Sequence, residues 1–371
     1  MRLFVKFSNT AFVVFGQDCV ILKQKNMFSK TFIRVNWITL VLIFLVIIAG
    51  SIVRNTGSGM GCPDWPTCFG KWIPPTSSEQ LPANYKEIYG EKRVMKVEKF
   101  ASFLSAIGMG ETAQKIKKDP RTYEELPFNA TQTWTEYGNR LTGFLAGNGV
   151  LIIFLWSLFV YRSDRRLLVL TLLNLIFIGL NGWFGSLVVA TNLVPWTITV
   201  HMFLAIVVVI LQLMIIRRIS PKFQKTLNLP DGMKWLIVII LLITTYQIFL
   251  GTQVREYIDE LTQKGLGRDE WSNYFGTSYF IHRSFSWGVL VLMLFLVLLN
   301  YKTEKLSAIT IAFGVMSLEL ICGVFLAYAN MPGFVQVSHL LFAIVLFAIL
   351  FMIYIRTKSL KKMIGTKNNL R

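Results

Sequence analysis

The most regular feature of the chain is a series of apolar runs separated by polar segments. Eight runs are long enough to matter, at about 37–53, 141–161, 167–189, 197–216, 235–254, 284–301, 306–328 and 339–355. Each has 17 residues or more, which as a helix crosses a hydrocarbon core of ~30 Å. The pattern therefore predicts an all-α, polytopic membrane protein with eight transmembrane helices.

Composition and charge agree with this prediction. The chain is 54% hydrophobic and 16% charged, whereas its net charge is +18. In a soluble protein such a charge suggests nucleic acid. Here the whole excess lies in the two ends and in alternate connections between the apolar runs, while the rest of the chain is neutral. The positive-inside rule places these segments, and both termini, in the cytoplasm. We therefore expect no nucleic-acid partner.

The chain contains an internal repeat. Gly185 precedes His201 by 16 residues, and Gly323 precedes His339 by the same interval. An asparagine follows the glycine by seven residues in both copies, at Asn192 in the first. Because each unit contains four helices, both enter the membrane from the same side. We expect two duplicated four-helix bundles related by a pseudo-twofold axis along the membrane normal.

A shared Gly-x-x-Val-Arg at 50–54 and 251–255 extends the repeat to the first helix of each half. The repeat divides the chain into two halves, 37–217 and 235–356, joined by a cytoplasmic linker 218–234. The first half contains a long external loop, 55–135. A cytoplasmic N-terminal segment, 1–36, precedes the halves and a basic cytoplasmic tail, 357–371, follows them. Residues 85–118 predict an amphipathic helix on the outer surface. The pattern leaves open whether translation starts at Met1 or Met27, and it indicates no signal peptide.

All three histidines fall near the outer ends of predicted helices. His201 and His339 are counterparts, and the counterpart of His282 is Asn139. Two histidines on facing helices commonly hold a haem iron in a helix bundle. Zinc is less favoured because it requires four ligands. A single membrane histidine also serves in polar packing or proton relay, but the pair His282 and His339 favours haem.

Charged residues accompany these positions. Arg140 and Arg283 each follow the ligand position, where a guanidinium suits the propionate carboxylates of a haem, although a membrane-interface anchor is the alternative. Glu136 lies one helical turn before Asn139, where the second half has Tyr279. A carboxylate facing a cofactor acts in proton transfer, while a solvated acid at a helix start is the simpler reading.

Four cysteines are distributed unevenly. Cys62 and Cys68 lie in the first external loop, where oxidation is permitted if the outside is a periplasm-like space. Cys322 lies inside an apolar run and behaves there as a small apolar residue. Cys19 belongs to the N-terminal segment.

Three features together resemble the haem A synthase family, over about residues 37 to 356. They are the loop Gly-Ser-Gly-x-Gly-Cys-Pro-Asp-Trp-Pro-x-Cys at 57–68, the Glu-x-x-x-Arg sequence at 136–140, and the duplicated helices with outer histidines. The resemblance implies oxidation of the C8 methyl of haem O to a formyl group, which gives haem A for a-type terminal oxidases.

The resemblance also implies roles for individual residues. A resident haem b would lie between His282 and His339, and the first half would bind the substrate haem through His201. Glu136 matches a glutamate regarded as important for activity. Cys62 and Cys68 match a loop pair thought to form a disulfide used in catalysis or haem handling. The expected partners are haem O, membrane lipid, an unspecified electron donor, a thiol-disulfide reductase and a second copy of the chain. The cysteine pair and the lack of a recognisable transit peptide favour a bacterial inner membrane.

The chain departs from the family at one position. Members commonly have a second histidine where Asn139 stands, and an amide is a poor ligand for haem iron. The change is compatible with a variant that still hydroxylates and with a weakened substrate site. Two alternatives to a synthase are a haem-binding or haem-transfer protein without catalysis and a quinol-linked b-type cytochrome. A di-haem electron carrier would keep two ligands in both halves, and the cysteine loop occurs in only one, which favours chemistry in the first half.

Overall fold

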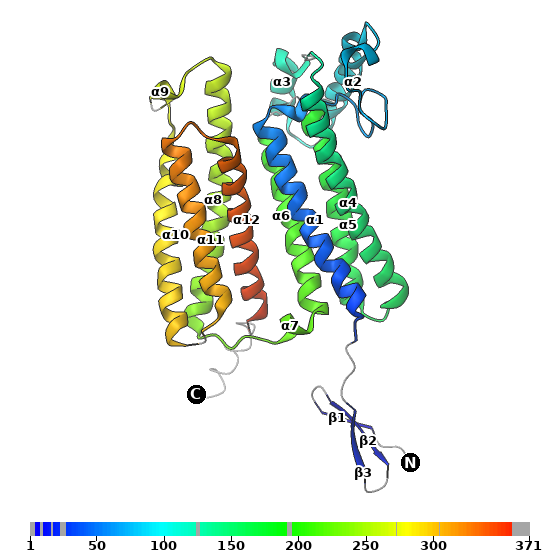
Figure 1. Cartoon of the computed structure of the whole chain (residues 1–371), viewed down its shortest axis with the longest axis vertical. Helices are drawn as coiled ribbons and strands as arrows, with labels where there is room; N and C mark the ends of the chain where they lie inside the picture. Colours follow the sequence, from blue (N-terminus) through cyan, green and yellow to red (C-terminus); the bar gives the residue numbers. More distant parts are fainter. Residues whose placement is uncertain are drawn as a thin grey trace.

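The computed structural model describes residues 4–7, 10–15, 18–22, 27–123, 127–190, 195–271, 273–303 and 305–357. Within these residues, eight helices are long and apolar enough to cross a membrane, as predicted. They are α1 (Lys30–Asn55), α4 (Ala130–Val160), α5 (Arg165–Ala190), α6 (Pro195–Ile219), α8 (Asp231–Gln263), α10 (Thr277–Lys302), α11 (Ser307–Tyr328) and α12 (Gly333–Arg356). Figure 1 shows them upright and side by side.

Several helices extend beyond the apolar runs that predicted them. α4 starts at Ala130, where the side chain of Asn129 accepts a hydrogen bond from the backbone N–H of Gln132 at 3.1 Å. α1 starts at Lys30 behind an equivalent cap by Ser29. These caps satisfy backbone donors that the first turn of a helix leaves unpaired. The polar extension of α4 carries Glu136 and Arg140, so the cap helps to position the site described below.

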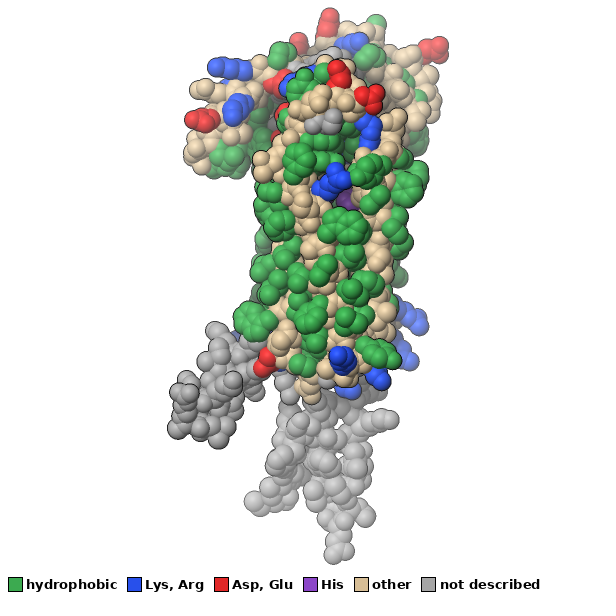
Figure 2. Space-filling view, turned by 90° about the vertical axis from the view of Figure 1, so that its left-hand side faces the viewer, with side chains coloured by type: hydrophobic (Ala, Val, Ile, Leu, Met, Phe, Trp, Pro, Cys, Tyr) green, Lys and Arg blue, Asp and Glu red, His purple; other side chains and the backbone are tan. Residues whose placement is uncertain are grey.

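The helices form two groups, one of α1, α4, α5 and α6 and one of α8, α10, α11 and α12 (Figure 1). α12 contacts both α1 and α6 where the groups meet. The core of the second group contains fully buried aliphatic side chains such as Ile237, Met293 and Leu350. Large apolar side chains also cover the outside of the helices, visible as the green surface of Figure 2. Such a surface is favourable against lipid tails.

Buried polar side chains link the helices of the first group. Gln212 of α6 donates to the backbone carbonyl of Asn36 of α1 at 3.0 Å, and Asn174 of α5 donates to Gln212 at 2.8 Å. All three residues have no exposed surface. Because lipid supplies no competing partners, such bonds hold helices together in a membrane.

The long loop 55–135, predicted to be external, folds over one end of the first group (Figure 1). It contains α2 (Tyr85–Ala106), α3 (Gly110–Lys118) and short 3-10 turns at Ser58–Met60, Ser78–Gln80 and Pro120–Tyr123. The single helix predicted over 85–118 is thus two helices, separated where Gly108 has a φ of +86°. Phe100 and Leu104 of α2 are buried, and Leu187 of α5 and Trp196 of α6 pack against their cluster. The loop is therefore anchored to the membrane helices.

Three short strands precede α1, and the sequence pattern did not predict them. β1 (Phe4–Phe7), β2 (Thr10–Phe15) and β3 (Asp18–Leu22) form an antiparallel sheet in that order. Two further short helices are α7 (Pro221–Gln224) and α9 (Arg268–Trp271). Most of the predicted C-terminal tail, residues 358–371, lies outside the described residues, as does Asn192 of the repeat.

Candidate functional site

Each histidine packs edge-on against a glycine of a neighbouring helix. The pairs are Gly185 with His201 at 3.1 Å, Gly251 with His282 at 3.3 Å, and Gly323 with His339 at 3.3 Å, each measured from the position of an added Cβ to the imidazole Cε1. A side chain larger than hydrogen would press on the ring at this distance. The glycines therefore form a cradle that lets each imidazole lie close to the next helix.

His282 of α10 and His339 of α12 face each other. Their ring centres are 6.3 Å apart and their planes are nearly perpendicular, at 88°. Two imidazoles that each bind one metal through a bond of ~2 Å place their ring centres about 6 Å apart. The measured separation therefore fits a single iron between the two rings.

The backbone orients these rings. Nδ1 of His339 lies 3.0 Å from the carbonyl oxygen of Glu319 in α11. When Nδ1 donates its proton to this carbonyl, Nε2 carries the free lone pair that binds a metal. The backbone of His282 is held by the side chain of Gln247, which donates to its carbonyl at 3.0 Å. The rings of His201 and His282 interact in the same way with the backbone of Asn181 and of Gln247, although their buried Nδ1 atoms make no hydrogen bond of standard geometry among the described residues.

Zinc fits these residues less well. In the described part of the chain, no three His, Cys, Asp or Glu side chains come together in a way that could hold a metal ion. A structural zinc site requires four such ligands and a catalytic one usually three. The donor set of two imidazoles therefore favours a group that supplies its own equatorial ligands, as a haem does.

The first group of helices has a different set of side chains at the corresponding place. Asn139 of α4 lies opposite Gly50 of α1, with its Oδ1 3.8 Å from an added Cβ. Glu136, one turn earlier, is only 3% exposed. Its carboxylate accepts a hydrogen bond from Nε of Arg140 at 3.0 Å, and the side chain of Asn139 interacts with the same carboxylate.

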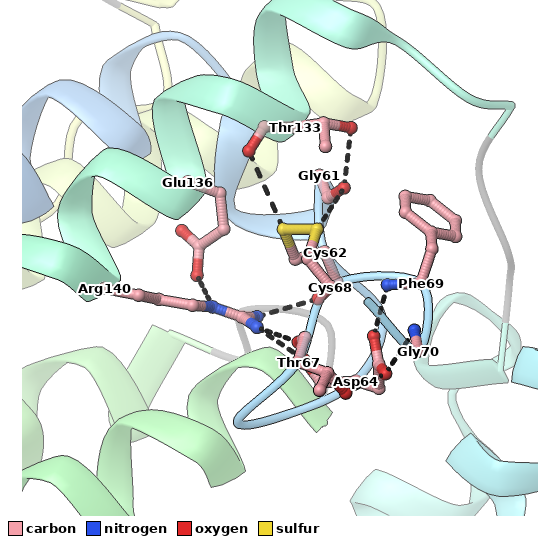
Figure 3. Close-up of a disulfide and its surroundings, with 10 residues drawn as sticks. All are labelled: Gly61, Cys62, Asp64, Thr67, Cys68, Phe69, Gly70, Thr133, Glu136 and Arg140. Atoms are coloured by element: carbon pink, nitrogen blue, oxygen red, sulfur yellow. Dashed lines mark hydrogen bonds and ion pairs between the residues drawn. A yellow bond between two sulfur atoms is a disulfide. The ribbon is translucent and has the colours of Figure 1, made fainter. Parts of the chain in front are cut away.

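Arg140 connects Glu136 to the external loop (Figure 3). Its guanidinium also donates to the backbone carbonyls of Cys62 at 2.8 Å and Thr67 at 2.9 Å, and to that of Asp64. All three nitrogens of this guanidinium thus have partners within the protein. The propionate contact predicted for Arg140 stays a prediction, and the observed geometry assigns Arg140 to holding the loop.

The loop backbone packs directly on the first turns of α4. The hydroxyl of Thr133 donates to the carbonyl of Gly61 at 2.8 Å. A Cβ on Gly61 would lie 2.5 Å from the backbone of Gln132, so only glycine fits there. Cys62 and Cys68 form a disulfide, both are buried, and Sγ of Cys62 lies 3.6 Å from the carbonyl oxygen of Thr133 (Figure 3).

Asp64, which lies between the two cysteines, stabilises the turn that follows Cys68. Its carboxylate accepts hydrogen bonds from the backbone N–H groups of Phe69 at 2.6 Å and Gly70 at 2.8 Å, and from the hydroxyl of Thr67 at 2.5 Å. Phe69 and Gly70 adopt positive φ angles of 53° and 72°, a conformation that aspartate side chains stabilise in tight turns. Sequence reasoning missed this role, although an aspartate six residues before Gly70 in a Gly/Pro-rich loop is a signal for it.

A cationic environment surrounds the loop. Lys96 of α2 lies near Asp64, Arg140 and Arg93, and burial lowers its pKa while the Asp64 carboxylate opposes that effect. The buried guanidinium of Arg93 reaches the carbonyl of Val189 in α5 at 3.5 Å. The end of the first group that the loop covers therefore carries several basic side chains, which suits an anionic ligand.

The corresponding region of the second group is more open. Arg283 is exposed and donates to the hydroxyl of Tyr328 at 2.6 Å. Tyr279 stacks on Phe275 with ring centres 3.8 Å apart, and both line a cavity of about 200 Å³ between α8 and α10. Figure 2 shows a histidine (purple) between the helices on this side of the molecule. No long loop of the kind seen in the first group covers this described region.

Glu319 is a further residue that sequence reasoning overlooked. Its carbonyl orients His339, and its carboxyl group lies within the apolar stretch of α11. The signal in the sequence was a single acid inside a membrane helix, which is uncommon and usually functional. Asn181 occupies the corresponding place in the first half, four residues before Gly185, as Glu319 precedes Gly323.

Eight membrane-spanning helices and a pair of facing imidazoles define a polytopic membrane protein with the donor set of a haem site. The chain belongs to the family of cytochrome oxidase assembly proteins (COX15-CtaA), whose family model matches residues 34–105 and 108–351.

Several relatives carry the name haem A synthase. The Bacillus mycoides protein is 22% identical over 335 residues, covering 85% of this chain and 90% of that protein. The Shewanella oneidensis protein is 26% identical over 188 residues (50% of this chain, 44% of that protein), and the Geobacillus kaustophilus protein is 23% identical over 222 residues (58% and 53%). The aligned part thus spans about half the length of these last two relatives.

Proposed function

We propose that this protein is a haem A synthase that oxidises the C8 methyl of haem O to a formyl group. The observation that carries the proposal is the asymmetry between two corresponding places. One half has two imidazoles at the spacing of a single iron. The other half has a single imidazole, His201, and a buried carboxylate, Glu136, that Arg140 ties to a disulfide loop. Family membership and the names of the relatives support it.

In the second half, His282 and His339 would hold a resident haem b. When bound, this group supplies one-electron transfer. The protein contributes the Glu319 carbonyl, which orients His339, and the glycines that let both rings approach. Arg283, exposed at the outer end of α10, is free to reach a propionate by exchanging its bond to Tyr328.

In the first half, His201 would hold the iron of the substrate haem O, and Asn139 stands at the place that corresponds to His282 of the second half. Two successive hydroxylations of the methyl give a gem-diol, which loses water to leave the aldehyde. Each hydroxylation consumes two protons and two electrons besides dioxygen. Glu136 is buried, and its carboxylate interacts with the side chain of Asn139, so we assign it to proton transfer.

Arg140 and the loop act on Glu136 from outside. The guanidinium fixes one carboxylate oxygen at 3.0 Å and ties it to the loop carbonyls, so the loop closes the outer end of the site. A closed end excludes water, which strengthens electrostatic interactions inside and protects reactive species. Reduction of the Cys62–Cys68 disulfide by a thiol-disulfide reductase would loosen this closure, and we assign the pair to haem handling on that basis.

The two helix groups are best explained as a duplicated four-helix unit. The glycine–imidazole contacts recur at corresponding positions of both groups, and Asn139 faces Gly50 as His282 faces Gly251. With the basic segments in the cytoplasm, both termini lie inside and the site lies near the outer surface of a bacterial inner membrane. Haem O and lipid are then the immediate partners, with an electron donor and a second copy of the chain as further ones.

The non-catalytic alternatives account for less of the structure. A haem-transfer protein or a quinol-linked cytochrome would use the paired imidazoles equally well. Neither requires a buried carboxylate beside one site only, nor an arginine that ties it to a disulfide loop.

Substitution of the carboxylate tests the proposal. Glu136→Gln keeps the shape and a hydrogen bond acceptor but removes the transferable proton. In cells that supply haem O, we expect this variant to retain bound haem and to lose conversion to haem A by at least about a hundredfold, the lower end of the usual range for a general acid–base residue. Conversion at the wild-type level would remove Glu136 from the reaction.

A further inference from the structure

We infer that the first half binds its haem through a single protein ligand, His201, and that the opposite iron position is an open site for small ligands beside Asn139 and Glu136. The inference rests on the proposed function only for the presence of a haem in this half. It assigns to this chain a ligand-binding site that its second half does not have.

The position of Asn139 comes from the internal correspondence of the two halves. His282 of α10 faces Gly251 of α8, and Asn139 of α4 faces Gly50 of α1 in the same relation. Both contacts join the first and second membrane helices of a group. Asn139 is therefore the residue that stands where the second half presents its first imidazole.

An asparagine at this place leaves the iron position free for two reasons. Its amide is one bond shorter than an imidazole, so its outer atoms end short of the position that Nε2 of a histidine reaches. Its carbonyl oxygen also belongs to the donors that suit magnesium and calcium, whereas imidazole suits iron. The structure agrees with a smaller side chain here, because Oδ1 of Asn139 lies 3.8 Å from an added Cβ on Gly50, whereas the imidazole Cε1 atoms lie 3.1 to 3.3 Å from the same position on their glycines.

The surroundings of this position are polar and fixed. The side chain of Asn139 interacts with the Glu136 carboxylate, which is 3% exposed and bonded to Arg140. Arg140 is in turn held by three loop carbonyls (Figure 3). Hydrogen-bond donors and steric access around an open haem position decide which small molecules bind there. An amide N–H beside a buried carboxylate suits a small polarisable ligand that accepts a hydrogen bond.

The second half lacks each of these elements. Its iron position is filled from both sides, because His282 and His339 have the separation of two ligands on one metal. Tyr279 stands in place of Glu136 and stacks on Phe275. A ligand added from solution should therefore bind to one haem of the protein and leave the other unchanged.

Spectroscopy of the purified, haem-loaded protein tests this inference. We expect the oxidised protein to show one high-spin and one low-spin haem by electron paramagnetic resonance. Cyanide should convert the high-spin signal, and carbon monoxide should bind the same haem after reduction. Two low-spin haems, a single low-spin haem, or spectra that neither cyanide nor carbon monoxide changes would overturn the inference.

Two variants locate the open position. Asn139→His restores the side chain found in the second half, so it should convert the high-spin haem to low-spin and abolish cyanide binding. His282→Asn is the matched control, because it should create a second cyanide-binding haem. If Asn139→His does not yield folded protein, the His282→Asn variant and the wild-type spectra decide the question. Cyanide binding that persists unchanged in folded Asn139→His would place the open position elsewhere and contradict the proposal.

These results are separate from the test of the function. Extraction and chromatography of the same preparation give its haem types independently of spin state. Haem A in a protein with two low-spin haems would refute the open position and leave the synthase proposal intact. A cyanide-binding, high-spin haem in a protein that never forms haem A would refute the synthase and leave the open position intact.

Discussion

Several glycines lie where one helix or loop comes very close to a side chain or the backbone of a neighbouring helix. Three of them accommodate imidazole edges, and Gly61 accommodates the backbone of α4. Backbone cannot move aside as a flexible side chain can, so the approach at Gly61 is the least tolerant of these contacts. It also sits next to Cys62, which couples the position of the disulfide to the start of α4.

Gly61→Ala should displace the loop from α4. The added Cβ would lie 2.5 Å from the backbone of Gln132, and overpacking of this kind typically costs about 1–3 kcal/mol. We expect faster reduction and alkylation of Cys62 and Cys68 and a reduced yield of haem A. Gly90→Ala in α2 is the control, because nothing lies within 4 Å of its added Cβ. Equal thiol accessibility in the two variants would show that the close approach is unimportant.

Arg140→Ala tests the connection between loop and carboxylate. The change leaves Glu136 buried without its cation and frees the loop carbonyls, and breaking such a buried pair costs about 3–5 kcal/mol. We expect loss of haem A formation and exposure of the disulfide, with the low-spin haem of the second half retained. Arg283→Ala, which loses a contact to an exposed Tyr328, should leave the disulfide protected. Similar disulfide exposure in both variants would argue against the assignment of Arg140.

The histidines, Glu136 and the cysteine pair could be chosen from the sequence because each is a rare residue type in an informative place. The partners of Arg140 could not. They are backbone carbonyls of a loop without periodicity, and any residue type provides a carbonyl. The role of Asp64 in the turn was not predicted either, because the sequence attributes that turn to the neighbouring Trp65 and the two prolines.

Among the helices, the apolar runs predicted all eight membrane spans, and the polar ends escaped prediction. α8 continues to Gln263 and α4 begins at Ala130, because helix caps and neighbouring segments stabilise turns that carry no apolar signal. The break between α2 and α3 depends on the left-handed conformation of Gly108. Polar links between helices, such as that of Gln212, depend on three-dimensional neighbours and have no local signature.

Gln212→Leu tests the polar link at the centre of the first group. The variant leaves the buried amide of Asn174 without its acceptor and removes the bonds from Gln212 to Asn36, and interhelical bonds in membranes contribute about 0.6–2 kcal/mol. We expect a lower midpoint of thermal unfolding in detergent. Thr245→Val removes a hydroxyl that bonds only within its own helix, so it should have a smaller effect. A larger loss for Thr245→Val would show that the link is not a source of stability.

At the scale of the whole molecule, two helix groups carry corresponding contacts, and the first is distinguished by its loop, its carboxylate and its asparagine. The glycine and histidine spacings of the sequence repeat match these contacts, and the duplication of a four-helix unit stays a prediction. The way α12 contacts α1 and α6 could not be predicted, since apolar helix faces in lipid look alike in sequence. One group suited to electron transfer beside one suited to oxidation is the arrangement that the proposed reaction requires.

The haem content of the purified protein is the measurement that tests this account most directly. The protein would be produced in cells that supply haem O, and its haems would be extracted and separated by chromatography. The account predicts haem A together with haem B, with haem A absent from the Glu136→Gln variant. Haem B as the sole haem, from a folded wild-type protein supplied with haem O, would contradict it and favour a carrier or cytochrome.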